Sequence, residues 1–229
     1  MLIGNLKTLG GQVAIKFVPG ELKALAPGEI DAYVVSTETG FSPLGSNSRF
    51  ISAELGIPVS EIATLADWNR FENPGVTLVA LSSRRPGSDL RGVILAPAET
   101  SECYKKFATP RFGLPFRDFY YNVAFEAISH AAKSWGAKRM AFSHLSGCGS
   151  FHENIATCVA EALAHFCEDS GEHMESMTFL GDGEVSTDHL AGIRRLNLEG
   201  DSSKHRAIGL EVERRDGATL VHLDWSRNA

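Results

Sequence analysis

The sequence lacks three features that would each indicate a class of protein. No apolar run approaches the ~20 residues that a membrane-spanning helix needs. There is no excess of basic residues, since 22 Lys and Arg stand against 28 Asp and Glu, a formal net charge of −6. This balance argues against sequence-independent binding of nucleic acid, which depends on cations that displace counterions, and leaves open only a local basic pocket. The start, MLIGNLKTLGGQ, lacks the charged and apolar regions of a signal peptide.

Cysteine is also scarce. The four cysteines, Cys103, Cys148, Cys158 and Cys167, include no CxxC pair. In a chain of 229 residues they do not form a disulfide framework, so we expect a reducing, cytoplasmic location. Cys158 falls on the apolar face of an expected helix and is interpreted as a small buried hydrophobic residue. Only Cys148 lies in a glycine-rich turn.

Alternating apolar segments, separated by Gly and Pro, predict an α/β fold of three layers with a mixed sheet. The loop at 84–91 joins two strands as a hairpin, which makes the sheet mixed rather than all parallel. Helices are expected at 47–55, at 118–135 and from about residue 151. Strands are expected at 12–18, 31–37, 77–83, 92–98, 139–145 and 176–181.

The pattern changes after Gly181. A helix is expected at 186–196, and Asp216-Gly217 predicts the turn of a β-hairpin. We therefore divide the chain into an α/β domain at 1–181 and an extension at 182–229. The extension is too small for a good core of its own, so we expect it to pack on the same domain.

Two loops follow strands of the expected sheet, at the edge where ligands bind to open α/β folds. They are 36–48, STETGFSPLGSNS, and 146–150, SGCGS. Ser150 and Glu153 form a capping box that predicts a helix start. Gly147 and Gly149 allow a sharp turn that directs free backbone N–H groups at an anion. Each loop alone is also compatible with an ordinary strand-to-helix turn; together they would suit a diphosphate.

The stretch HLSGCGSFHEN, residues 144–154, admits two other interpretations. His144, Cys148 and His152 are spaced four residues apart, but the glycines break the helix that would bring them together, so no metal site is predicted. Cys148 could instead be a nucleophile, since a helix N-terminus lowers a thiol pKa and either histidine could serve as base. Anion binding is favoured because the capping box and glycines explain the loop without thiol chemistry. Arg84 and Arg85 are interpreted as a solvated loop tip that could reach an acidic ligand.

At this point the chain resembles the macro domains, which bind ADP-ribose and related nucleotides. VPGELKAL and IDAYVVSTETGFSPLG resemble the family's opening, "GDIT" followed by "VDAIVNAAN" and a glycine-rich first phosphate loop. GAKRMAFSHLSGCGSFHENIATCVAEALAHF resembles its later strand, its "STGxxG" second phosphate loop and the following helix. The resemblance covers residues 12 to 181, most of the chain.

The resemblance implies roles for individual residues. Glu21 falls where the family has an acidic residue that recognises the adenine amino group. Phe151 falls near an aromatic residue at the distal ribose. Ser36 and Thr37 replace part of the "NAAN" stretch. The phosphate loops correspond to Gly40, Gly45 and Ser46 in the first, and to Ser146, Gly147, Cys148, Gly149 and Ser150 in the second.

Two departures bear on activity. Ser36-Thr37-Glu38-Thr39 stands where the family has "NAAN", so the asparagine implicated in ADP-ribosyl hydrolysis is absent. Glu38 also places a negative charge near the expected diphosphate. We expect binding or processing of a nucleotide or ADP-ribose-like molecule, without cofactor, metal, nucleic acid or membrane, and leave a homo-oligomer open. The alternatives are a hydrolase that uses Cys148 or Glu38, and a non-catalytic scaffold like the macro-like domain of leucyl aminopeptidases.

Overall fold

The computed structural model describes residues 2–8, 11–26, 28–37, 46–66, 75–97, 116–143, 153–181, 210–215 and 218–224. In chain order the elements are β1 Leu2–Thr8, β2 Gly11–Pro19, the 3-10 helix η1 Leu22–Ala24, β3 Ala32–Thr37, α1 Ser46–Leu55, α2 Val59–Ala66, β4 Gly75–Ser82, β5 Gly92–Pro97, α4 Phe116–Trp135, β6 Arg139–Ser143, α5 Glu153–Ser170, β7 Ser176–Gly181, β8 Leu210–Arg215 and β9 Ala218–Asp224.

The strands form one mixed sheet in the order β1-β2-β7-β6-β3-β5-β4-β9-β8. Five central strands, β2, β7, β6, β3 and β5, run parallel to one another. Antiparallel strands flank this group, β1 on one side and β4, β9 and β8 on the other. Parallel strands buried on both faces need apolar side chains at successive positions, and AYVV in β3 and VILA in β5 supply them.

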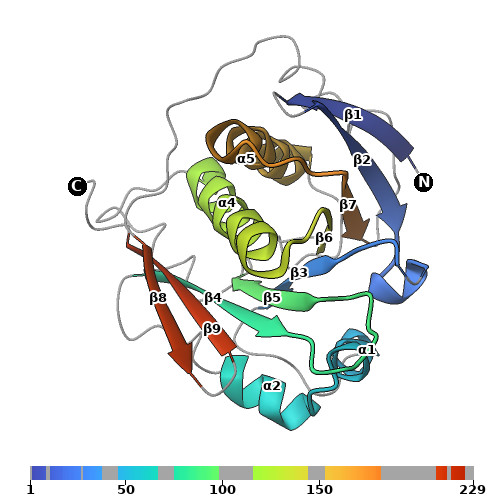
Figure 1. Ribbon diagram of the computed structural model, residues 1–229, viewed down its shortest axis with the longest axis vertical. Coiled ribbons are helices and arrows are strands. Elements are labelled where there is room, and N and C mark those ends of the chain that lie inside the picture. Colours follow the sequence, from blue (N-terminus) through green and yellow to red (C-terminus); the bar gives the residue numbers. More distant parts are fainter. Residues whose placement is uncertain are drawn as a thin grey trace.

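Helices cover both faces of the sheet, which makes three layers (Figure 1). Successive strand residues point to opposite faces, so Ala32 and Val34 pack with α4 and α5 whereas Tyr33 and Val35 pack with α1, α2 and η1. Figure 1 shows α4 and α5 side by side on one side of the strands. The largest fully buried side chains include Tyr33, Tyr120, Tyr121, Phe17, Phe142 and Phe166.

The observed elements confirm the expected α/β fold with a mixed sheet. The hairpin around 84–91 joins β4 and β5 as antiparallel neighbours, and β7 occupies the expected 176–181. Strand β6 is described only to Ser143, and α5 from Glu153. Sequence reasoning missed β1, whose Gly4 and Asn5 weaken a strand pattern. It also missed α2, because Gly56 and Pro58 were interpreted only as the end of α1.

The C-terminal hairpin extends the same sheet. Strands β8 and β9 pair antiparallel across Arg215 and Ala218, around the expected Asp216-Gly217 turn. Strand β9 in turn pairs with β4 over seven residue pairs, from Gly75 with Asp224 to Leu81 with Ala218. The helix expected at 186–196 lies outside the described residues. Within the described part of the chain, no helix has the length and apolar character that a membrane crossing needs.

Candidate functional site

The carboxyl ends of five parallel strands meet at one edge of the sheet. Their last residues are Pro19 in β2, Gly181 in β7, Ser143 in β6, Thr37 in β3 and Pro97 in β5. This edge is where open α/β sheets bind ligands. Both loops singled out from the sequence follow strands that end here, 36–48 after β3 and 146–150 after β6.

The sheet changes direction between β3 and β6. From β3 the chain passes through α1 and α2 towards β4 and β5, on one side in the sheet order. From β6 it passes through α5 to β7, on the other side. The helices also lie on opposite faces, since Leu55 of α1 belongs to one core cluster and Val159 of α5 to the other. Neighbouring strands whose connections diverge in this way leave a crevice at their carboxyl ends.

Two serines lie at the mouth of this crevice. The regular β3–β6 pairing runs from Ala32 with Met140 to Val34 with Phe142. Beyond it, the Ser36 N–H donates to Ser143 Oγ at 2.9 Å, in place of a ladder carbonyl. The two hydroxyl oxygens lie 3.5 Å apart, and Ser143 is 6% exposed. A side-chain hydroxyl therefore ends the pairing and places two polar groups where the strands separate.

The turn after β2 places Glu21 at the same edge. Gly20 has a φ of 110°, which a residue with a side chain rarely adopts, and its N–H donates to the Gly181 carbonyl at 2.8 Å. Glu21 follows in extended conformation and occupies the N-cap position of η1. Its carboxylate forms an ion pair with Lys23 Nζ at 3.2 Å, with the two side chains 35% and 57% exposed. An exposed pair of this kind contributes at most about 1 kcal/mol, so a ligand can compete for the carboxylate.

The structure places four of the predicted ligand residues. Glu21 and Ser36 lie at the ends of β2 and β3, Thr37 is the last residue of β3, and Ser46 is the first residue of α1. Ser143 was not predicted; its signal is a polar residue at the end of an apolar strand. The other candidates, Glu38, Gly40, Gly45, Ser146, Gly147, Cys148, Gly149, Ser150 and Phe151, lie outside the described residues.

The cysteines that the structure describes are buried in α5. Cys158 and Cys167 are 2% and 1% exposed and neither forms a disulfide; burial was expected for Cys158. Burial raises the pKa of the Cys167 thiol, although the Met174 backbone and the Thr8 side chain partly oppose the shift by hydrogen bonding. In the described ranges no three His, Cys, Asp or Glu side chains gather as metal ligands. His144, Cys148 and His152 lie outside those ranges.

Comparison with solved structures identifies the fold. A mutant of the Oceanobacillus iheyensis macrodomain aligns over 87% of this chain and 93% of its own, with a TM-score of 0.54 and 12% identity. The same macrodomain with ADP aligns over 87% of this chain and 97% of its own, with a TM-score of 0.51 and 10% identity. No protein-family model matches the sequence, and no curated protein is significantly similar to it. At this identity the likeness concerns the fold alone: the chain has a macro domain-like fold.

Proposed function

We propose that this protein binds a nucleotide of the ADP-ribose type in the crevice between β3 and β6. The observation that carries the proposal is the change of direction at these two strands, with their helices on opposite faces. Ligands of open α/β sheets occupy such positions. The Oceanobacillus iheyensis macrodomain, which shares the fold, has been solved with ADP.

The diphosphate is proposed to lie between the loop after β3 and the loop after β6. Each loop connects a strand end to a helix start, α1 at Ser46 and α5 at Glu153. Helix N-termini carry free N–H groups and a partial positive charge, and both favour phosphate. The glycines at 147 and 149 allow the backbone to approach closely.

Glu21 is proposed to accept a hydrogen bond from the exocyclic amino group of the base. Its position directly after β2 brings it to the same edge as the crevice, and its exposed pair with Lys23 is weak enough to be displaced. We propose binding, in which Ser36 and Ser143 supply hydroxyls suited to orienting the ligand.

Calorimetric titration with ADP-ribose, ADP and adenosine tests the proposal. We expect Gly147→Val and Gly149→Val to abolish binding, because a β-branched side chain crowds the anion, while Cys148→Ser keeps it. Gly171→Ala is a matched control. It removes a glycine with φ of 67° at the end of α5, near the amino end of β7 and away from the crevice, so it lowers stability without lowering affinity.

The titration also separates the alternatives. A true ligand at a hundred times its dissociation constant raises the free energy of unfolding by about 2.7 kcal/mol. A melting temperature that no nucleotide raises would therefore favour a non-catalytic scaffold. Turnover of ADP-ribose that is lost in Cys148→Ser while binding persists would establish the hydrolase. Binding that is lost in Cys148→Ser but kept in both glycine variants would overturn the anion-binding loop.

A further inference from the structure

The strand at one border of the sheet offers a surface to another chain. Strand β1 is the terminal strand on its side of the described sheet, and its neighbour there is β2 (Figure 1). All seven residues from Leu2 to Thr8 pair with β2 in one continuous register, without a bulge. A terminal strand presents backbone N–H and C=O groups to which a further strand can bond.

The hydrogen bonds of β2 show which backbone groups of β1 point outward. The Ala14 N–H of β2 donates to the carbonyl of Glu175, the residue before β7, at 3.0 Å. Successive residues of a strand direct these groups to opposite sides, so those of Val13 point to β1 and are exchanged with its partner Leu6. By the same alternation, the residues of β1 whose N–H and C=O groups point away from β2 are Ile3, Asn5 and Lys7.

Strand β1 lacks the features that protect a terminal strand from pairing with another chain. Such strands carry several charged residues, a proline or a bulge. In β1, LIGNLKT, Lys7 is the one charged residue and there is no proline. Strand β8, at the opposite border of the described sheet, is LEVERR, with four charged residues among six. Of these two borders, β1 is therefore the one suited to pairing.

The sequence of β1 is complementary to itself in antiparallel orientation. Asn5 is the midpoint of the strand and is one of its outward-directed residues. A twofold pairing centred on Asn5 therefore uses the whole strand, with Asn5 opposite Asn5 and Lys7 opposite Ile3 of a second copy, so that no like charges face each other. The corresponding pairing of β8, centred on Val212 or on Glu213, would place glutamate opposite glutamate.

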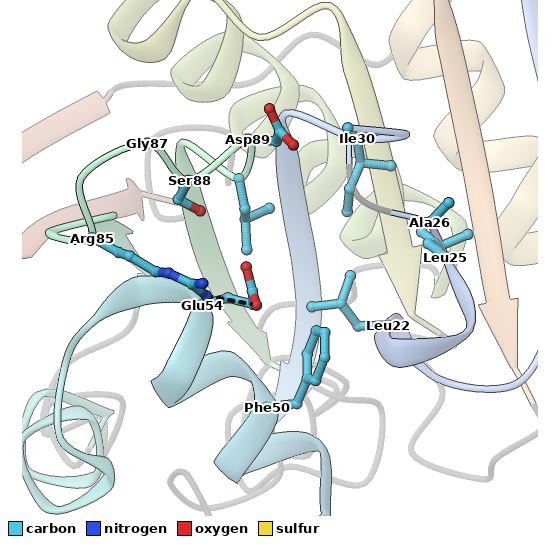
Figure 2. Close-up of a pocket in the computed structure, with 12 residues that line it drawn as sticks. Leu22, Leu25, Ala26, Ile30, Phe50, Glu54, Arg85, Gly87, Ser88 and Asp89 are labelled. Carbon is cyan, nitrogen blue, oxygen red and sulfur yellow. Dashed lines mark hydrogen bonds and ion pairs between the residues drawn. The ribbon is translucent and has the colours of Figure 1, made fainter.

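A pocket on the face that α1 covers offers less to a partner. It has a volume of about 210 Å³ and lies between α1, residues 22–30 and the loop from β4 to β5 (Figure 2). The Arg85 guanidinium and the Glu54 carboxylate in this pocket bond to each other at 2.9 Å. Leu22 and Leu90 in its wall are only 4% and 5% exposed. These groups are used within the protein, whereas the outward groups of β1 point to no strand of the described sheet.

From these features we infer that a second copy of this chain pairs with β1 about a twofold axis and extends the sheet across both copies. The axis is perpendicular to the sheet, so α5 of each copy lies on the same side. The parallel strands of the two copies run in opposite directions, and the two proposed nucleotide crevices therefore open at opposite edges of the extended sheet. Because strand pairing buries less area than a standard interface, we expect a dimer that dissociates on dilution.

Sedimentation velocity of the 229-residue chain over a series of concentrations tests this inference. Asn5→Lys and Asn5→Asp each place like charges opposite each other at the axis, and each should raise the dimer dissociation constant about fivefold at low ionic strength. An equimolar mixture of the two variants should dimerise at least as tightly as the wild type, because opposite charges then face each other. Ala53→Lys is the matched control, at an exposed position of α1, which contacts β5. It should leave the dissociation constant unchanged.

Two backbone readouts locate the interface. Asn5→Pro removes an outward N–H from each copy, which a terminal strand tolerates within its own sheet, and should raise the dissociation constant about tenfold or more. In the wild type, the Ile3 and Lys7 amides should gain protection from hydrogen exchange as the protein concentration rises. The Leu6 amide, which is bonded to β2, should change little.

A wild-type chain that stays monomeric up to about 1 mM would overturn the inference. A dimer that forms equally well in Asn5→Pro and Asn5→Lys would overturn it too. So would a mixture of Asn5→Lys and Asn5→Asp that dimerises as weakly as either variant alone. Nucleotide does not enter these measurements, so a dimer that binds no ADP-ribose would contradict only the proposed function.

Discussion

Replacing Asp31 by Asn should destabilise the protein through the strands that flank the crevice. Asp31 precedes β3 and is 3% exposed. Its Oδ2 accepts the N–H groups of Lys138 at 2.8 Å and Arg139 at 2.9 Å, and its Oδ1 pairs with Arg139 Nη2 at 2.6 Å. The Arg139 guanidinium also donates to the Gly28 carbonyl. One carboxylate thus connects the amino ends of β3 and β6.

The magnitude follows from these contacts. Asn retains one acceptor oxygen, and its amide NH₂ cannot accept from Arg139 or from a backbone N–H. Hydrogen bonds to a charged group contribute about 1.5–3 kcal/mol each. Because the Arg139 side chain is 37% exposed, its share is reduced by solvent. We expect a loss of about 2–3 kcal/mol in the free energy of unfolding. Glu61→Gln, which breaks an exposed ion pair with Arg84, should cost about 0.5 kcal/mol.

The pH dependence gives an independent check. Burial alone raises the pKa of Asp31, but the Arg139 hydrogen bond, the two backbone N–H groups and the Arg139 charge outweigh it and lower the pKa below its usual value. The stabilisation is therefore complete above the unfolded pKa of about 3.9. It is lost as pH falls through the lowered folded pKa. Urea unfolding of both proteins at pH 7 and pH 3 should show a gap that narrows at pH 3. A constant gap, or a gap at pH 7 below about 0.5 kcal/mol, would refute this account.

Two further changes test the packing on α4. Gly92→Ala places a Cβ 2.5 Å from the Trp135 ring and 2.8 Å from the Leu81 carbonyl, so we expect a loss of about 1–3 kcal/mol in the free energy of unfolding from overpacking. In a Trp135→Leu background urea unfolding should show a smaller loss, because only the clash with the Leu81 carbonyl remains, and an unchanged loss would contradict the clash with the ring. Burial raises the pKa of Glu126 to about 7, and the charge of Lys133 partly opposes this shift. The protonated carboxyl therefore contributes its full stability below the unfolded-state pKa, and this stability is lost as pH rises through the folded-state pKa. Glu126→Gln should therefore match the wild type near pH 4 and exceed its free energy of unfolding by about 3 kcal/mol at pH 8, and identical pH profiles of unfolding would show that folding does not raise the pKa of Glu126.

Local sequence patterns predicted the elements in which several consecutive residues are apolar and buried. In β3 the run AYVVS places Ala32 and Val34 on one face and Tyr33 and Val35 on the other, which is recognisable as a strand buried on both sides. The same holds for β7, whose six residues are all buried. Strand β1 has no such pattern. Residues 2–8 form a strand because they pair antiparallel with β2, where Leu6 lies opposite Val13.

Interactions between distant positions could not be predicted in the same way. The Ser36 N–H and the Ser143 hydroxyl are 107 residues apart in the chain, as are Asp31 and Lys138. No local periodicity relates such positions, and only the parallel pairing of β3 with β6 brings them together. Ser36 and Thr37 were predicted at the ligand edge because the loop at 36–48 follows an apolar strand, whereas Glu21 was predicted only from the resemblance to macro domains. Ser143 was missed because its signal, one polar residue at the end of an apolar strand, does not by itself indicate a ligand contact.

The two edges of the parallel strands differ in how their polar groups are used. At the amino edge, Asp31 accepts two backbone N–H groups and a guanidinium, and Arg91 donates to the Trp135 and Gly136 carbonyls at 2.7 and 2.8 Å. At the carboxyl edge, the regular β3–β6 pairing stops after Val34 and Phe142, and the Glu21 carboxylate pairs with the exposed Lys23. Groups saturated by the protein contribute stability, whereas a ligand must find groups that it can still bond. Substitutions at the amino edge should therefore lower the free energy of unfolding without changing nucleotide affinity in the folded protein, and those at the carboxyl edge should do the reverse.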